Sequence, residues 1–192
     1  SMKNSGHRLG ASGTPLENTI EGLQKSSNKP KRGDFRYWEF DIRESSDETV
    51  FVFHDDNIEV SGNIFETSEM TFSQIREAGL DMGISIPTFS EVCDFLEGAE
   101  ENVMVEIKYL SSEKARSEVL EYLERSSHWK AMATPERFSK SFPSEIRDIW
   151  ADRFDSSGVE LVRVGRHRVN LFNSYKSRLR WFFAQPRWLF GL

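Results

Sequence analysis

The sequence is poor in cysteine and has no long hydrophobic run. Cys93 is the only cysteine among the 192 residues, which excludes an internal disulfide framework. No apolar stretch approaches the roughly 20 residues that a membrane-spanning helix needs, and no basic segment followed by an apolar one marks a secretory signal. Ser1-Met2 resembles a remnant of tag removal, so we expect the native chain to begin at or near Met2. These absences predict a cytoplasmic protein.

Acidic residues are missing from the last part of the chain. The net charge of −6 argues against a general nucleic-acid binder, so we expect no nucleic-acid partner. From Leu161 to the end there is no Asp or Glu, and the Arg and Lys residues give this part a charge of +7, which leaves −13 for residues 1–160. The segment from about 165 to 192 is therefore electrostatically distinct.

The length and composition fit one domain over residues 1–192. The mass is 22.3 kDa and 38% of the residues are hydrophobic, which is enough to bury a sizeable core. Helical patterns alternate with apolar runs that are typical of strands. We expect strands at 3–8, 37–42, 49–53, 103–108, 130–133 and 158–164, and helices at 20–25, 71–75, 90–96, 113–126 and within 135–154. This alternation predicts an α/β fold with a parallel sheet, and the 49–53 run, apolar on both faces, reads as a parallel strand.

Two carboxylates stand out in the strand at 37–42. Alternate side chains of a strand share a face, so Glu39 and Asp41 point one way while Trp38, Phe40 and Ile42 point the other. Paired carboxylates repel each other unless a cation or a proton offsets their charge, and hard divalent cations prefer oxygen ligands. The alternative is an exposed edge strand with solvated acids.

Other polar residues follow the expected strands and favour the cation. The polar side chains fall where strands end, which is the edge of a parallel sheet that forms active sites. They are His7, Arg8, Glu39, Asp41, His54, Glu106 and Lys108. Three carboxylates suit one Mg²⁺ or Ca²⁺ better than zinc. Two histidines offer a general acid and a general base, and the two cations can hold a phosphate, so the set predicts metal-assisted phosphoryl transfer.

Five motifs in order carry a family resemblance. They are Gly6-His7-Arg8 with Gly10-Ala11-Ser12-Gly13, Pro15-Leu16-Glu17-Asn18-Thr19, Glu39-Phe40-Asp41, His54-Asp55 and Glu106-Ile107-Lys108. Together they resemble the glycerophosphodiester phosphodiesterase family. A lone Glu-x-Asp would mean little, but the whole ordered set over residues 6–108 is specific.

The resemblance implies a fold, an activity and roles for residues. The fold would be a TIM-type (β/α) barrel, with Glu39, Asp41 and Glu106 binding a divalent metal. His7 and His54 would be the acid/base pair. The family cleaves small glycerophosphodiesters to glycerol 3-phosphate and an alcohol, through attack by a glycerol hydroxyl that gives a cyclic phosphate. The expected substrate is such a diester or a polymer that contains glycerol phosphate. The phosphate would be held by the cations Arg8 and Lys108.

The chain also departs from the family pattern. Leu9 stands where the family has glycine, and Leu16 is inserted into its Pro-Glu-Asn-Thr motif. Only 84 residues follow Lys108 in the 192-residue chain, whereas a barrel of roughly 250 residues has four further strand–helix units. We therefore expect a barrel that is reduced or incomplete in its C-terminal half. The rival function is a non-catalytic module that binds a phosphodiester on a shrunken barrel.

The basic C-terminal segment allows two interpretations. Aromatic residues, among them Trp181, Phe182 and Trp188, alternate with arginines, a pattern suited to peripheral contact with an anionic membrane. The same aromatics can instead pack on the barrel or on another subunit, because Pro186 interrupts any long amphipathic helix.

Overall fold

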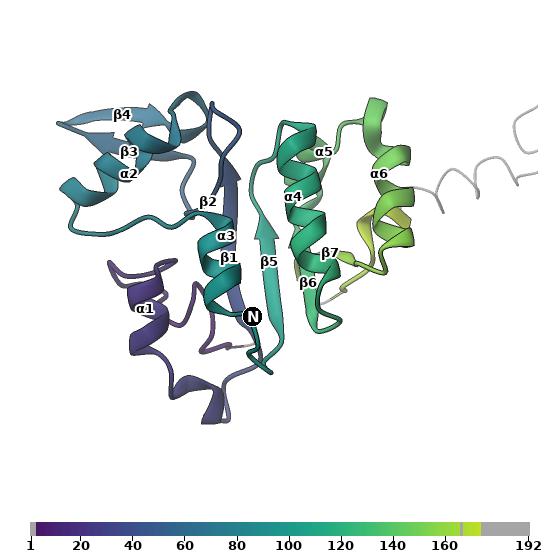
Figure 1. Cartoon of the computed structure of the whole chain (residues 1–192), viewed down its shortest axis with the longest axis horizontal. Helices are drawn as coiled ribbons and strands as arrows, with labels where there is room; N and C mark the ends of the chain where they lie inside the picture. Colours follow the sequence, from purple (N-terminus) through teal and green to yellow (C-terminus); the bar gives the residue numbers. More distant parts are fainter. Residues whose placement is uncertain (1–2, 166, 174–192) are drawn as a thin grey trace, which may run out of the picture.

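The computed structural model describes residues 3–165 and 167–173, and Figure 1 shows their arrangement. The predicted segment at about 165–192 falls mostly outside these residues. The α-helices are α1 (Ile20–Lys25), α2 (Phe72–Asp81), α3 (Phe89–Phe95), α4 (Glu113–Glu124), α5 (Pro135–Ser141) and α6 (Ser144–Ser156), and the 3-10 helices are η1 (Lys29–Lys31) and η2 (Thr67–Glu69). No helix in these ranges is long and apolar enough to cross a membrane.

A five-stranded sheet in the order β2-β1-β5-β6-β7 forms the centre of the molecule. Its strands are β1 (Trp38–Glu44), β2 (Val50–Val52), β5 (Val103–Ile107), β6 (Trp129–Ala133) and β7 (Leu161–Arg163). Strands β1, β5, β6 and β7 are parallel to one another. The predicted mixed α/β fold with a parallel sheet is confirmed. Over the described residues the sheet is open, with β2 and β7 as its two edge strands.

Strand β2 runs antiparallel to β1, and the prediction of a parallel strand at 49–53 is wrong. The run is apolar on both faces because β2 lies between two clusters of buried side chains. Val50 and Val52 belong to the main core, whereas Phe51 packs with Ile58, Ile75 and other residues beneath α2. The antiparallel return brings the chain after β2 back beside the middle of β1.

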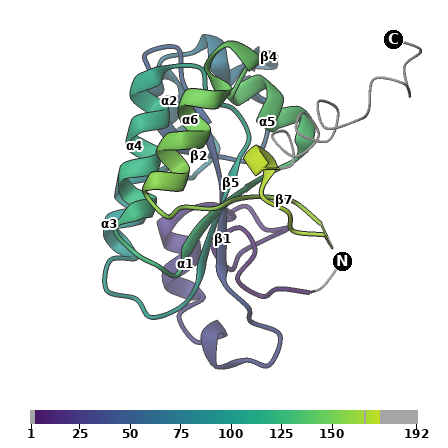
Figure 2. The same ribbon diagram turned by 90° about the vertical axis from the view of Figure 1, so that its right-hand side faces the viewer.

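Helices cover one face of the sheet. Figure 2 shows α3, α4 and α6 together on that side. The side chains of Phe40 on β1 and Val105 on β5 are fully buried there, packed in one core with helical residues such as Phe89 and Phe154. This packing follows the expected alternation along β1, since Trp38, Phe40 and Ile42 all enter the core. The opposite face of β1 is left for Glu39 and Asp41.

Residues 57–66 form a hairpin away from the main sheet. Strands β3 (Asn57–Val60) and β4 (Asn63–Glu66) pair antiparallel, and Figure 1 shows the hairpin beside α2. Its base is fixed because both the amide and the hydroxyl of buried Thr67 donate to the carbonyl of Asp56.

The first segment of the chain is a series of turns, and the strand expected at 3–8 is absent. Two hydrogen bonds still tie it to β1: the Glu39 amide donates to the Gly6 carbonyl (3.0 Å), and the Leu9 amide donates to the Glu39 carbonyl (2.7 Å). Arg8, Leu9 and Gly10 then have positive φ angles of 50°, 59° and 80°. A left-handed leucine costs about 1–2 kcal/mol. Its fully buried side chain offsets this cost, which explains how the loop accepts Leu9 in place of glycine.

Candidate active site

Three carboxylates meet on the sheet face that the helices leave uncovered. Asp41 and Glu106 are direct partners in the register of β1 and β5, and Glu39 lies two residues before Asp41 on the same face. One carboxylate oxygen from each lies within 4.8 Å of the others. All are buried, with Glu39 and Asp41 each 1% exposed. The structure thus brings together the three acids that the sequence predicts as metal ligands.

The hydrogen bonding of these acids suits a cation. Glu39 Oε2 accepts from the Arg8 amide (2.9 Å), and Asp41 Oδ2 accepts from the Asn18 side-chain amide (2.9 Å). The other oxygens, Glu39 Oε1 and Asp41 Oδ1, are buried without any hydrogen-bond partner among the described residues. Such orphaned anionic oxygens are costly to bury, and a hard divalent cation is the kind of ligand that satisfies them.

The mutual repulsion of the acids is visible in their proton affinity. Burial, and next the neighbouring Asp41 carboxylate, raise the pKa of Glu39 well above its usual value. The same two causes raise the pKa of Glu106. Lys108 Nζ donates to Glu106 Oε1 (2.8 Å) and lies 3.7 Å from Asp41 Oδ1, so it offsets part of the charge. The set still carries an excess of negative charge, which favours binding of a cation.

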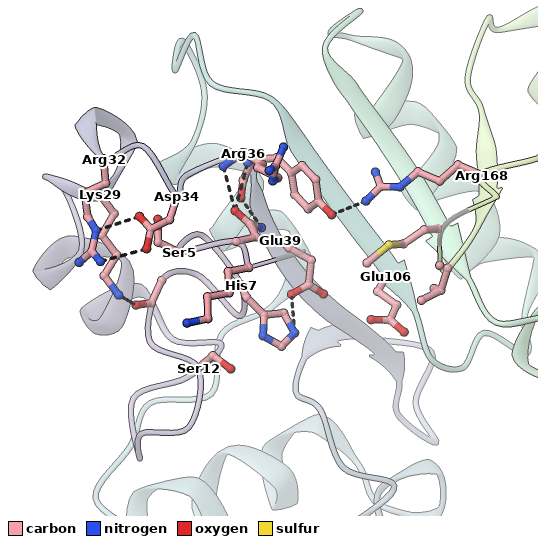
Figure 3. A pocket seen from close by; sticks show the side chains of 17 residues that line it. Ser5, His7, Ser12, Lys29, Arg32, Asp34, Arg36, Glu39, Glu106 and Arg168 are labelled. Carbon is pink, nitrogen blue, oxygen red and sulfur yellow. Dashed lines mark hydrogen bonds and ion pairs between the residues drawn. The ribbon is translucent and has the colours of Figure 1, made fainter. Parts of the chain in front are cut away.

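The turn that carries His7 and Arg8 lies directly against these acids. His7 Nε2 is 3.5 Å from Glu39 Oε2, and Figure 3 shows the ring directed at that carboxylate. Burial and the adjacent Arg8 cation lower the pKa of His7, which favours its neutral form. Gly6 makes this approach possible, because a Cβ atom there would lie 2.0 Å from the Tyr37 carbonyl oxygen.

Arg8 is held by Glu17, which belongs to the motif Pro15-Leu16-Glu17-Asn18-Thr19. The Arg8 Nη1 donates to both carboxylate oxygens of Glu17 at 2.9 Å, and Glu17 Oε2 also accepts from the Gly13 amide. Arg8 Nε lies 3.8 Å from Asp41 Oδ2. Arg8 therefore links the first loop to Asp41, with most of its charge balanced by Glu17.

The return of β2 along β1 sets the position of His54. The amide of Phe53 donates to the Asp41 carbonyl (3.0 Å), so His54 follows the end of an antiparallel strand and not the carboxyl end of a parallel one. His54 lies near enough to His7 to act on it electrostatically, and its ring Nδ1 is 2.7 Å from Asp55 Oδ1, so Asp55 orients the ring. The site thus forms on the face of the sheet rather than strictly at its edge.

A pair of arginines sharing Asp56 braces the segments that carry His54 and Lys108. Buried Arg43 donates to Asp56 Oδ1 (2.5 Å) and to the carbonyl of His54. Arg137 on α5 donates to the same Oδ1 (3.1 Å) and to the carbonyl of Lys108 (3.0 Å). The hydrogen bond from Arg137, followed by that from Arg43, lowers the pKa of Asp56 to about 2.

Sequence reasoning assigned no role to Asn18 or to this brace. Asn18 is 2% exposed, has a φ of 59° and bonds Asp41 through both its amide nitrogen and its carbonyl oxygen, the latter accepting from the Asp41 amide. The position of Asn18 in the Glu17-Asn18-Thr19 motif is the one sequence feature that could have indicated this role. Arg137 gave no signal, because it lies 81 residues from Asp56 in the sequence.

A cleft of about 1190 Å³ opens over the acids. His7, Glu39 and Glu106 line its floor, and Met132 of β6 and Val164 after β7 contribute an apolar wall. Figure 3 shows these polar side chains directed into the same space. The cleft gives a small molecule access to Glu39, Glu106 and His7.

Comparison with known proteins identifies the family and the fold. The model described as the glycerophosphoryl diester phosphodiesterase family matches residues 7–154. No curated protein matches the chain. Among solved structures, a glycerophosphodiester phosphodiesterase from Parabacteroides distasonis is 12% identical with a TM-score of 0.51, and the match covers 87% of this chain and 83% of that one.

Two longer structures are also similar. A protein from Silicibacter pomeroyi assigned as a glycerophosphoryl diester phosphodiesterase is 17% identical with a TM-score of 0.56, over 82% of this chain and 62% of that one. One from Galdieria sulphuraria assigned as a glycerophosphodiester phosphodiesterase is 15% identical with a TM-score of 0.55, over 77% and 57%. This chain thus spans less than two thirds of both structures, and at such identities the likeness concerns the fold.

Proposed function

The chain belongs to the glycerophosphoryl diester phosphodiesterase family, and from this premise we propose that it hydrolyses glycerophosphodiesters to glycerol 3-phosphate and an alcohol. One observation carries the proposal: three buried carboxylates lie within 4.8 Å of one another, with His7 and Lys108 in contact with them. Carboxylates, a histidine and a lysine in mutual contact are groups that metal-assisted phosphoryl transfer uses.

Glu39, Asp41 and Glu106 are the residues that would hold one divalent cation, Mg²⁺ or Ca²⁺. When bound, such an ion supplies charge stabilisation at the phosphoryl oxygens. The two unpartnered oxygens of Glu39 and Asp41 support this assignment. Lys108, 11% exposed and 2.8 Å from Glu106, stands next to the place where the phosphate would lie.

The two histidines are suited to opposite proton transfers. We assign His7 as the general base, because its lowered pKa keeps the imidazole neutral near pH 7. The base takes the proton of the free glycerol hydroxyl as that oxygen bonds to phosphorus. His54, oriented by Asp55, gives a proton to the departing alcohol oxygen as its bond to phosphorus breaks. Water then opens the cyclic phosphate with the two roles reversed.

Release of glycerol 3-phosphate from a panel of glycerophosphodiesters tests the proposal. We expect release in Mg²⁺ or Ca²⁺, none in chelator, and a loss of roughly 10²-fold or more for His54→Asn. Substrates lacking a free glycerol hydroxyl should not react. Binding of the diesters without turnover in either metal would refute the proposal and would identify a phosphodiester-binding module instead.

A further inference from the structure

The rim of the cleft carries positive charge that the site just described does not use. The cations come from segments far apart in the sequence, namely the first residues, the loop after α1 and the chain after β7. They are Lys3, Lys29, Arg32, Arg36 and Arg168. Figure 3 shows Lys29 and Arg32 on one side of the cleft and Arg168 reaching in from the other, with Arg36 between them.

Most of these cations have no carboxylate partner. Arg32 is the exception, because it forms an ion pair with Asp34 (2.9 Å). The Lys29 ammonium donates to the Gly10 carbonyl, and Arg168 donates to the Tyr37 hydroxyl, so both have neutral partners. Among the described residues no ion pair involves Lys3 or Arg36. The rim therefore has a net positive charge.

The acidic floor of the cleft does not need this charge. A divalent cation together with Lys108 would balance the three carboxylates, and Glu17 balances Arg8. The single negative charge of a bound phosphodiester would then take up one positive charge of the rim, and Lys3, Lys29, Arg36 and Arg168 together supply more than one. The unbalanced rim cations are therefore available to a second anionic group.

Two of the rim cations are held in place. The guanidinium of Arg168 lies over the Tyr37 ring, 5.2 Å from its centre, and Tyr37 is two residues before Glu39 and so shares its direction. Lys29 is fixed to the loop that carries His7. Cations held in this way lose less conformational freedom when they bind an anion.

We propose that the cleft binds a second phosphate group, carried by the alcohol part of the substrate, between Lys29, Arg36 and Arg168. This inference rests on the proposed function and narrows its substrate class to glycerophosphodiesters whose alcohol is itself phosphorylated. Guanidinium groups match phosphate oxygens in geometry, and a terminal phosphate carries more negative charge than a carboxylate, which favours phosphate at a rim with several unpaired cations.

The test compares kcat/KM for two substrates that differ by one phosphate: glycerophosphoglycerol, and the same compound phosphorylated on its second glycerol. We expect wild-type protein to prefer the phosphorylated substrate by about tenfold at low salt, and the preference to shrink as salt rises. Arg36→Ala and Arg168→Ala should each reduce the ratio of the two kcat/KM values about three- to tenfold. A third substrate, with an internal phosphodiester in place of the terminal phosphate, distinguishes a chain of glycerol phosphates from a single end group.

The matched control is Arg125→Ala. Arg125 also lies over a tyrosine ring, with its guanidinium 4.3 Å from the centre of Tyr122, but it does not line the cleft. This variant should keep the wild-type ratio. An equal kcat/KM for both substrates in wild-type protein, or an unchanged ratio in both rim variants, would overturn the second phosphate site.

A binding measurement separates this proposal from the proposed function. Calorimetry compares glycerol 1,3-bisphosphate with glycerol 3-phosphate. One outcome is that no diester is hydrolysed, but the bisphosphate binds more tightly than glycerol 3-phosphate and the difference in affinity is lost in Arg168→Ala. In that case the proposed hydrolase activity is wrong and the second phosphate site is supported. If the rim variants lose binding to anionic vesicles with no change in the bisphosphate affinity, the rim contacts a lipid surface and the phosphate site is wrong.

Discussion

Replacement of Glu39 by glutamine would change the charge of the buried acid cluster with little change in its shape. With chelator present, the wild-type protein holds Glu39, Asp41 and Glu106 within 4.8 Å. At that separation two charges repel by about 3 kcal/mol in an effective dielectric of about 20. We expect Glu39→Gln to relieve repulsion of this order at pH 7 and to raise the midpoint of thermal unfolding by about 6–12 °C, since 1 kcal/mol corresponds to about 2–4 °C for a chain of this size.

The pH dependence of this effect has a defined sign. The folded-state pKa of Glu39 is raised, so the folded protein holds this proton more tightly than the unfolded chain does. The corresponding stability is fully present below the unfolded pKa, about 4.3, and is lost as pH rises through the folded pKa. In chelator, wild-type protein should therefore lose stability from pH 5 to pH 7, whereas Glu39→Gln should change less.

Addition of metal should close most of the gap between the unfolding midpoints of the two proteins. A ligand present at about 100 times its dissociation constant stabilises by about 2.7 kcal/mol, so wild-type protein should gain about 5–11 °C in Mg²⁺ or Ca²⁺ and Glu39→Gln much less. Scanning calorimetry at several pH values, with metal and with chelator, measures each quantity. Glu21→Gln, an exposed neighbour of Lys25, serves as control and should behave as wild type. A full metal response in Glu39→Gln, or a lower midpoint than wild type in chelator at pH 7, would refute the reasoning.

Three further predictions concern the surroundings of the acids. His7→Asn should lose roughly 10²-fold or more in kcat while keeping the metal-induced rise in unfolding temperature, and wild-type kcat would make His7 structural. Asp56→Asn should lower kcat by about tenfold and shift the pH–rate profile, because Asp56 holds Arg43, which in turn donates to the His54 carbonyl. A change in thermal stability alone would limit Asp56 to a structural role. Gly6→Ala should lower the unfolding midpoint by several degrees and kcat with it, because its Cβ would lie 2.0 Å from the Tyr37 carbonyl oxygen; an unchanged midpoint would show that the turn can move freely.

The acid cluster could be predicted from the sequence because it depends on a local rule. Residues two apart in a strand lie on the same face, so Glu39 and Asp41 share one face of β1, and Met104 and Glu106 share one face of β5. The apolar character of 103–107 identifies a second buried strand, and in the structure this strand, β5, pairs parallel with β1. No long-range information was needed for this part of the site.

The orientation of β2 could not be predicted in this way. Burial on both faces is the usual mark of a parallel strand, but here a separate cluster beneath α2 buries Phe51. The Asp56 brace was likewise beyond the sequence, since Arg137 meets Asp56 through the packing of α5 and not through any local spacing. Both features depend on tertiary contacts, which single-sequence patterns do not contain.

The three acids, the two histidines, Arg8 and Lys108 all lie on β1 or on a segment that is hydrogen-bonded to it. Turn 6–9 forms backbone hydrogen bonds with Glu39, and the residue after β2, Phe53, donates its amide to the Asp41 carbonyl. The Lys108 amide donates to the Ile42 carbonyl (2.9 Å). The site and strand β1 should therefore open as one cooperative unit. In native-state hydrogen exchange, the amides of Leu9, Phe53 and Lys108 should share one opening free energy, and metal should raise their protection together. Slow inactivation of the protein would then follow the rate at which this single strand is released.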